Sequence, residues 1–349
     1  STNNVTIDGG TLQISQNQTL NNLTLSAGTL IIDAGKTLTI NGSYNATGGT
    51  ITNNGTIIFN SDNNFPGAST TVSACASLEA NANITLNNSL TITNSLALNS
   101  GTFALNNNLL VLNGAALTSV SGIMTGGTTS DLNLQGTTGG TVILPLASDI
   151  TLRTINVAGN RVLEMDGVNN INLYGSLTIF SSATYDNGGE SQLQNFGGSV
   201  IIYGKFITRD TNGFTGTSTA IPSISPVLNS GCTVEFGRAG DQLISIRSDY
   251  QNLIFSNGGT KTLASASPIT PITGTVTISG STIVDVANNT FGHSATNFTM
   301  TGTSKFITGG SGVKPNMGGD YSLSSGTTIE FSGSSATDVR VSGVSYYNV

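Results

Sequence analysis

The chain has 349 residues, of which 8% are charged and 37% are hydrophobic, and its formal net charge is −7. Average domains carry roughly 25% charged residues, so Asn, Thr, Ser and Gly must supply most of the polar surface here. The sequence has no basic cluster, which argues against nucleic acid as a partner. It also has no run of 18 apolar residues, so we expect no membrane span.

A short repeat marks residues 1–60. A period near 20, built from alternating apolar and polar residues, is typical of a stacked β-solenoid, in which each turn buries its apolar row against the next. A third copy begins at residues 49–51 and continues at 56–59. The landmarks that recur after 18 residues are 10–14 (GTLQI) with 28–32 (GTLII), Val5 with Leu23, Ile7 with Leu25, and Thr19-Leu20 with Thr37-Leu38.

Short strands continue after an irregular stretch at 62–79. Apolar pairs then follow one another every six to seven residues, which predicts three short strands per turn joined by tight corners. Asn-Gly dipeptides supply the positive backbone angles that such corners need. We therefore predict an all-β fold, a right-handed parallel β-helix or β-solenoid with loop insertions. The pairs are Ile84/Leu86, Leu90/Ile92, Leu96/Leu98, Phe103/Leu105 and Leu110/Leu112.

The second half of the chain carries a longer repeat of about 95 to 100 residues. Three landmarks recur in one order, which indicates a duplicated unit. Because the second copy stops at Val349, we expect either that the natural chain continues or that another subunit completes this edge. The landmarks are 205–208 (KFIT) with 305–308 (KFIT), 231–236 (GCTVEF) with 326–331 (GTTIEF), and 250–253 (YQNL) with 346–349 (YYNV).

The distribution of charge suggests a boundary near residue 150. Lys36 is the only cation up to residue 152, whereas ten cations follow from Arg153 onward. We predict a nearly cation-free N-terminal β-solenoid at 1–150. A C-terminal β-solenoid of long repeat units, the second of them truncated, is predicted at 151–349.

The run at 231–263 (GCTVEFGRAGDQLISIRSDYQNLIFSNGGTKTL) resembles the recurring unit of large secreted surface adhesins of gliding, type IX-secreting Bacteroidetes. The likeness covers this window well, its copy at 326–349 in part, and the first 200 residues only in general solenoid character. It implies an extracellular or cell-surface role in which the repeats form a stalk. The C-terminal sorting domain usual in that family is not visible in the sequence.

Residues suited to catalysis or metal binding are scattered. The closest acidic pairs are Glu164/Asp166 and Asp186/Glu190. Both are flanked by turn residues, so we predict that they are solvent-exposed residues at corners of the coil. His293 is the only histidine and cannot build a multi-histidine metal site. We therefore expect no enzyme activity, no metal and no cofactor. The two cysteines, Cys75 and Cys232, are predicted to be buried and unpaired.

The candidate binding site lies in an aromatic-rich region between residues 174 and 236. Phe180 and Phe206 alternate with polar residues and are predicted to lie in the core. Tyr185 and Phe214 stand in Gly- and Asn-rich segments, where exposed rings beside polar groups would form a sugar-binding shelf. Packing of this irregular segment, 209–230, against the coil is the competing interpretation. The candidate ligand-binding residues are Tyr185, Asp186, Arg209, Asp210, Asn212 and Phe214.

The leading functional hypothesis is a non-enzymatic, extracellular cell-surface adhesin or stalk that displays binding loops to glycans or surfaces. The first alternative is a structural filament subunit that associates end to end, with the edge at 346–349 pairing with 5–7 of a neighbour. The second alternative is a β-helix enzyme that degrades polysaccharide.

Overall fold

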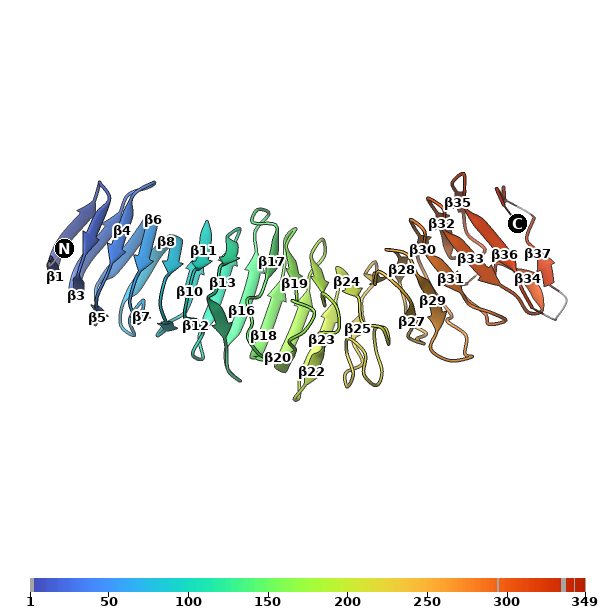
Figure 1. The fold of residues 1–349 in the computed structure, drawn as a ribbon, viewed down its shortest axis with the longest axis horizontal. Helices are drawn as coiled ribbons and strands as arrows, with labels where there is room; N and C mark the ends of the chain where they lie inside the picture. The colour runs from blue at the N-terminus through green and yellow to red at the C-terminus, as the bar shows by residue number, and fades with distance from the viewer. Residues whose placement is uncertain (1–2, 294, 334–336, 342, 349) are drawn as a thin grey trace. The chain divides into compact units, whose positions relative to one another are not determined.

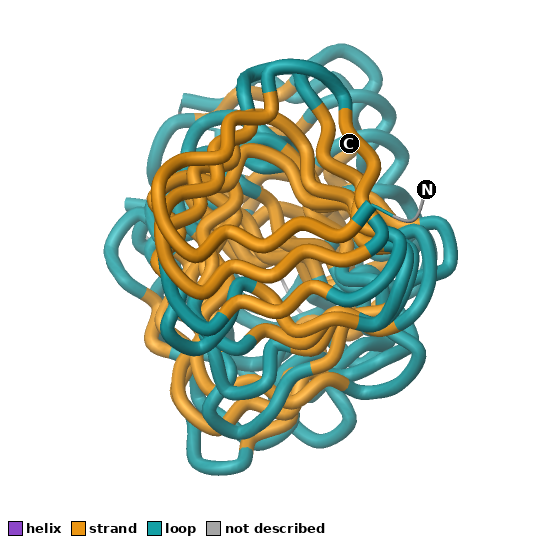
Figure 2. The backbone as a smooth tube through the Cα atoms, turned by 90° about the vertical axis from the view of Figure 1, so that its left-hand side faces the viewer, coloured by secondary structure: helices purple, strands orange, loops and turns teal. Residues whose placement is uncertain are grey.

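The chain folds as a β-solenoid. The computed structural model describes residues 3–293, 295–333, 337–341 and 343–348, and about half of the chain is β-strand, with no helix in the described part (Figures 1 and 2). The described strand pairs are parallel, and the coils make about 16 turns in all. The predicted parallel β-solenoid is thereby confirmed. Because it contains no helix, the described part of the chain holds no helical segment able to cross a membrane.

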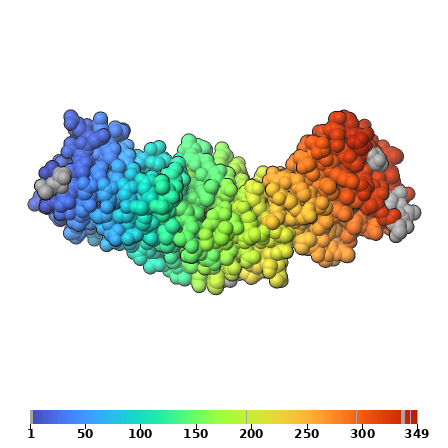
Figure 3. Space-filling model, in the orientation of Figure 1, coloured from blue at the N-terminus to red at the C-terminus, as the bar shows by residue number. Residues whose placement is uncertain are grey.

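Two compact units divide the chain. The first comprises Ser1–Leu177 with Phe196–Gly198, and the second comprises Thr178–Asn195 with Ser199–Val349. The boundary predicted near residue 150 from charge falls inside the first unit, at the start of strand β18 (Ile150–Val157). Within each unit the colours of Figure 3 follow one another in bands, as expected when each coil packs mainly against its neighbours in sequence.

The strands of the first unit form stacked parallel sheets. The largest sheet contains β1 (Asn4–Ile14), β3 (Asn22–Ile32), β6 (Thr50–Phe59), β8 (Thr71–Ala80), β11 (Ser95–Leu98) and β14 (Ala116–Ser119), with β2 (Gln18–Leu20), β4 (Thr37–Ile40) and β5 (Tyr44–Ala46) beside them. A second sheet contains β10 (Leu90–Ile92), β13 (Leu109–Asn113), β16 (Asp131–Gln135), β18 and β20 (Ile171–Ile179). The division between the two units falls within strand β20. The others are β7 (Asn63–Phe65), β9 (Ile84–Leu86), β12 (Thr102–Ala104) and β15 (Ile123–Thr125), and the pair β17 (Thr141–Ile143) and β19 (Val162–Glu164).

The second unit repeats the pattern with shorter strands. One row contains β21 (Thr184–Asp186), β24 (Lys205–Thr208), β26 (Thr233–Phe236), β28 (Asn252–Phe255), β30 (Thr275–Ile278), β32 (Asn297–Met300) and β35 (Tyr321–Leu323). Another contains β27 (Gln242–Ile244), β29 (Thr260–Leu263), β31 (Ile283–Asp285), β33 (Lys305–Thr308) and β36 (Thr328–Phe331). The remaining strands are β22 (Leu193–Asn195), β23 (Ser199–Ile202), β25 (Val227–Leu228), β34 (Gly312–Lys314) and β37 (Thr337–Val339).

The register of the first coils follows the sequence repeat, with one correction. Leu12 lies beside Leu30, 18 residues on, and Leu30 beside Ile51, as predicted. The match of Thr19-Leu20 with Thr37-Leu38 is wrong, because Leu20 pairs with Ile40 instead. The turn at 33–36, closed by a hydrogen bond from the Lys36 amide to the Asp33 carbonyl (3.0 Å), makes this corner two residues longer than the one before it.

Apolar side chains form continuous rows inside each unit. One row runs through Leu38, Ile57, Leu78 and Leu96, each the register partner of the next and each at most 1% exposed. Burial of such a side chain contributes about 1.5–3 kcal/mol, and in a coil it is achieved only because the next turn covers it. The two cysteines are buried and unpaired, as predicted, and burial raises the pKa of both thiols to about 11.

Amide side chains form a matching row on the outside. Asn60 donates to Asn41 (2.7 Å), Asn81 donates to Asn60 (2.7 Å), and Asn99 donates to Asn81 (2.8 Å). We call these four residues the asparagine ladder. An amide both donates and accepts, so identical side chains in successive coils satisfy one another. This is how a surface with few charged residues stays hydrogen-bonded.

Two strand pairs from the predicted duplicated unit have the same pairing. In the first copy β24 lies beside β26, and Lys205 forms an ion pair with Glu235 at 3.1 Å. In the second copy β33 lies beside β36, and Lys305 forms an ion pair with Glu330 at 2.5 Å. In both copies the Lys that begins one strand is the register partner of the Thr that begins the next. The two copies therefore share this strand pairing and ion pair, although the paired strands belong to different rows.

Candidate functional site

The aromatic members of the predicted site are buried. Tyr185 lies on β21, not in a loop, and both Tyr185 and Phe214 have 0% exposure. Each ring packs against Phe206, with ring centroids 5.0 Å apart in both cases. Tyr185 points inward because it is the register partner of Phe206, a core residue of the next coil. The prediction of an exposed shelf at these two rings is therefore wrong, and the competing interpretation, packing against the coil, describes them.

The charged members of the predicted site do come together. Asp186, only 3% exposed, accepts hydrogen bonds from Arg209 Nε and Nη2 at 2.9 and 2.7 Å. Arg209 also donates to the Gly237 carbonyl at 3.2 Å, and its bonds therefore link three successive coils. The pair belongs to the structure of the stack, because its bonds join Asp186 and Arg209 to one another and to the Gly237 carbonyl.

Asp210 and Asn212 occupy the beginning of the long segment that follows β24. The Asn212 amide donates to Asp210 Oδ1 at 2.7 Å, which closes a tight turn. Asp210 is buried, so it is not available to a ligand, and this part of the prediction is wrong. Asn212 is exposed, but its side chain donates to the Ser218 carbonyl at 2.9 Å and holds the loop together.

The buried tyrosines provide a test of this packing. Among the described residues, no hydrogen-bond partner lies within reach of the Tyr185 hydroxyl. We expect Tyr185→Phe to raise the free energy of unfolding by about 1 kcal/mol, because it removes an unsatisfied buried polar group. Tyr250→Phe is the matched control, since the Tyr250 hydroxyl donates to the Ser245 carbonyl at 2.9 Å and its loss should destabilise by about 1 kcal/mol. Urea unfolding measures both variants, and an equal loss of stability in the two would contradict the assignment.

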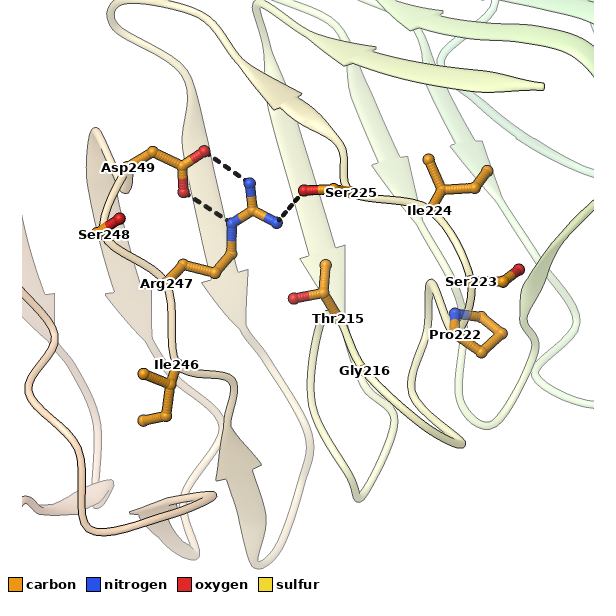
Figure 4. Close-up of a pocket in the computed structure, with 10 residues that line it drawn as sticks. All are labelled: Thr215, Gly216, Pro222, Ser223, Ile224, Ser225, Ile246, Arg247, Ser248 and Asp249. Carbon is orange, nitrogen blue, oxygen red and sulfur yellow. Dashed lines mark hydrogen bonds and ion pairs between the residues drawn. The ribbon is translucent and has the colours of Figure 1, made fainter. Parts of the chain in front are cut away.

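An open groove lies beside this cluster, in the second unit (Figure 4). Its volume is about 630 Å³. One wall comes from the segment between β24 and β26, and the other comes from the turn after β27. The lining residues are Thr215, Gly216, Pro222, Ser223, Ile224, Ser225, Ile246, Arg247, Ser248 and Asp249.

Arg247 joins the two walls. Its guanidinium donates to both carboxylate oxygens of Asp249 (2.8 and 2.6 Å) and to the Pro226 carbonyl (2.9 Å), and it reaches Ser225 Oγ at 3.5 Å (Figure 4). Its Cζ lies 5.9 Å from the centroid of the Phe214 ring. The Arg247 side chain is only 9% exposed, whereas that of Asp249 is 48% exposed. Phe214, predicted to contact a ligand, thus lies beneath the arginine that forms the groove.

The groove is polar and electrically balanced. Arg247 and Asp249 are its only charged lining residues, and they neutralise one another. The other polar groups facing it are hydroxyls, and the apolar ones are Ile224, Ile246 and Pro222. Hydroxyl groups both donate and accept hydrogen bonds, so this lining suits a neutral ligand rich in hydroxyls rather than an anion or a cation.

The loop that forms one wall is longer in the first copy of the duplicated unit than in the second. The register partners that begin β24 and β26 are 28 residues apart, whereas those that begin β33 and β36 are 23 apart. The first copy therefore has five extra residues between these strands. Loops that vary on a regular scaffold are where binding sites concentrate.

Part of this groove was predicted from the sequence. The predicted segment 209–230 supplies Thr215 and residues 222–225, whereas Arg247 and Asp249 on the other wall were not predicted. Arg247 and Asp249 both lie inside the motif at 231–263. The spacing of two residues between this cation and this acid was the sequence feature from which their ion pair could have been predicted. The contact of Arg247 with segment 209–230 could not be predicted in this way, because it depends on which coils are adjacent in the folded chain.

The described residues hold no group of three or more His, Cys, Asp or Glu side chains placed to bind a metal ion. Comparisons of the chain with family models, with curated proteins and with solved structures found no match.

Proposed function

We propose that this chain is a non-enzymatic, extracellular cell-surface adhesin or stalk whose groove between Thr215 and Asp249 binds glycans. The observation that carries the proposal is the neutral, hydroxyl-lined groove, built by a loop five residues longer than its counterpart in the duplicated unit. A repetitive coil supplies a rigid support for such a loop. The resemblance of residues 231–263 to the repeats of type IX-secreted surface adhesins of gliding Bacteroidetes supports the extracellular location.

A glycan array with groove variants tests the proposal. Ser248 is an exposed groove residue, so Ser248→Arg should fill the groove without disturbing the core. We expect bound neutral glycans to lose at least about tenfold in affinity, because the added side chain blocks shape-complementary contact. Ser325→Arg is the control, since Ser325 is exposed on a turn in the same unit and does not line the groove.

Two results would contradict this proposal. One is an array on which the wild-type protein binds no glycan, and the other is a glycan signal that Ser248→Arg leaves unchanged. Release of reducing or unsaturated sugar ends from a polysaccharide would instead favour the enzyme alternative. Concentration-dependent end-to-end polymers in solution would favour the filament alternative.

A further inference from the structure

A second groove in the same unit carries an exposed aromatic ring. Its volume is about 290 Å³, near the lower end of ligand-binding pockets. It crosses three successive coils, at 181–184, 203–205 and 231–233. The lining residues are Ser181, Ser182, Ala183, Thr184, Tyr203, Gly204, Lys205, Gly231 and Thr233.

Tyr203 forms an aromatic platform at this groove. Its side chain is 45% exposed and stacks on Phe180, which is 42% exposed, with ring centroids 6.4 Å apart and planes at 13°. The exposure of Phe180 corrects the prediction that it lies in the core. The Tyr203 amide donates to the Ile179 carbonyl at 2.8 Å, so the backbone that holds the ring is anchored. A large exposed ring fixed by a neighbouring ring is pre-organised for stacking, because little side-chain freedom remains to be lost.

The groove has no uncompensated charge. Lys205 is its only charged lining residue, and it forms an ion pair with Glu235 at 3.1 Å. The other oxygen of Glu235 accepts a hydrogen bond from Ser256 at 2.6 Å. A phosphate or carboxylate ligand therefore gains little attraction here. Serine and threonine residues line the groove together with the tyrosine ring, and this lining matches a ligand with one apolar face and a rim of hydroxyls.

We infer that the Tyr203 groove binds a neutral sugar residue by stacking it on the tyrosine ring. This inference rests on the proposed glycan-binding role and adds a second contact point and a class of sugar to it. The residues that line the Tyr203 groove belong to successive coils, so the groove suits an extended polysaccharide chain. Its compensated charge does not favour a free anion.

The duplicated unit supplies a natural comparison. The segment at 303–308 (TSKFIT) aligns with 203–208 (YGKFIT), and both copies keep the Lys–Glu ion pair. Thr303 stands where the first copy has Tyr203. Tyr203→Thr thus gives the first copy the residue that stands two positions before the KFIT strand in the second.

Affinity electrophoresis of the full chain provides the test. The gels contain a neutral polysaccharide (xyloglucan, laminarin or mannan) or an acidic one (alginate or polygalacturonate). We expect at least one neutral polysaccharide to slow the wild-type protein, and Tyr203→Thr to weaken that interaction about tenfold. Tyr174→Thr is the matched control, because Tyr174 is a 41% exposed tyrosine that stacks on Phe196 but does not line this groove.

Ser181→Arg, on an exposed turn that lines the groove, provides a second variant in case Tyr203→Thr unfolds the protein. The inference is overturned if no neutral gel slows the wild type, if only acidic gels do, or if the Tyr203 and Ser181 variants bind as the wild type does. Loss of binding in Ser248→Arg alone would support the proposed function and reject this inference. Loss in the Tyr203 and Ser181 variants alone would support this inference and reject the groove between Thr215 and Asp249 as the glycan-binding site.

Discussion

Replacing Arg161 by methionine is expected to lower the free energy of unfolding of the first unit by about 3 kcal/mol. Arg161 is completely buried, and none of the ion pairs found in the described residues includes it. Its guanidinium donates to the carbonyls of Ala115 (2.7 Å), Gly140 (3.2 Å) and Gln135 (3.4 Å). Burial lowers the pKa of Arg161. Methionine keeps much of the volume but removes these bonds, and among them the carbonyl of fully buried Ala115 loses the Arg161 donor.

Urea unfolding followed by circular dichroism measures this effect. Arg153→Met is the control in the same unit, because the Arg153 side chain is 52% exposed and pairs with Asp131 at the surface. Exposed ion pairs contribute about 0–1 kcal/mol, so the control should change stability little. Equal losses in the two variants would show that the carbonyl contacts of Arg161 do not stabilise the coil.

Asp210→Asn is expected to stabilise the protein at neutral pH and to have little effect at pH 4. Burial raises the pKa of Asp210 to about 6, and among the described residues its Oδ2 has no hydrogen-bond partner. Since the unfolded chain loses this proton at a lower pH, folding stability falls as pH rises from about 4 to 6. The shift corresponds to about 3 kcal/mol, which asparagine avoids because it carries no charge at any pH.

The measurement is the difference in unfolding free energy between Asp210→Asn and the wild type at several pH values. Comparing the two proteins at each pH cancels the titration of the other acidic groups. The difference should be near zero at pH 4 and reach about 3 kcal/mol in favour of the variant above pH 6. A difference that stays constant across this range would refute the assignment of a buried, raised-pKa carboxyl at Asp210.

The sequence was sufficient to predict the strands and most of their register, because side chains that share an inner row must recur at each turn. Leu12 and Leu30 illustrate this. The length of each corner was harder to predict from the sequence. Two extra residues in a turn shift the register of the whole following strand, as in the pairing of Leu20 with Ile40. Repeats also reveal duplicated units, which explains why the pairing of β24 with β26 was found again between β33 and β36.

The candidate site was less predictable, because inward and outward positions of a strand differ by a single residue. Tyr185 was expected outside and is buried, whereas Phe180 was expected inside and is exposed. Tyr185 is buried because its register partner is Phe206 of the next coil, whereas Phe180 lies just after the end of β20, where the strand alternation no longer applies. The wall containing Arg247 comes from a different coil than the loop it faces, so only the three-dimensional structure brings the two together.

The asparagine ladder has a consequence for the conditions under which such a surface works. Dissolved salt screens and weakens contacts between ions, whereas hydrogen bonds between neutral amides depend little on salt concentration. Amides also keep the same form from acidic to alkaline water, because they do not titrate. The outer face of the first coils is thereby suited to surroundings whose salinity and acidity are not controlled by a cell.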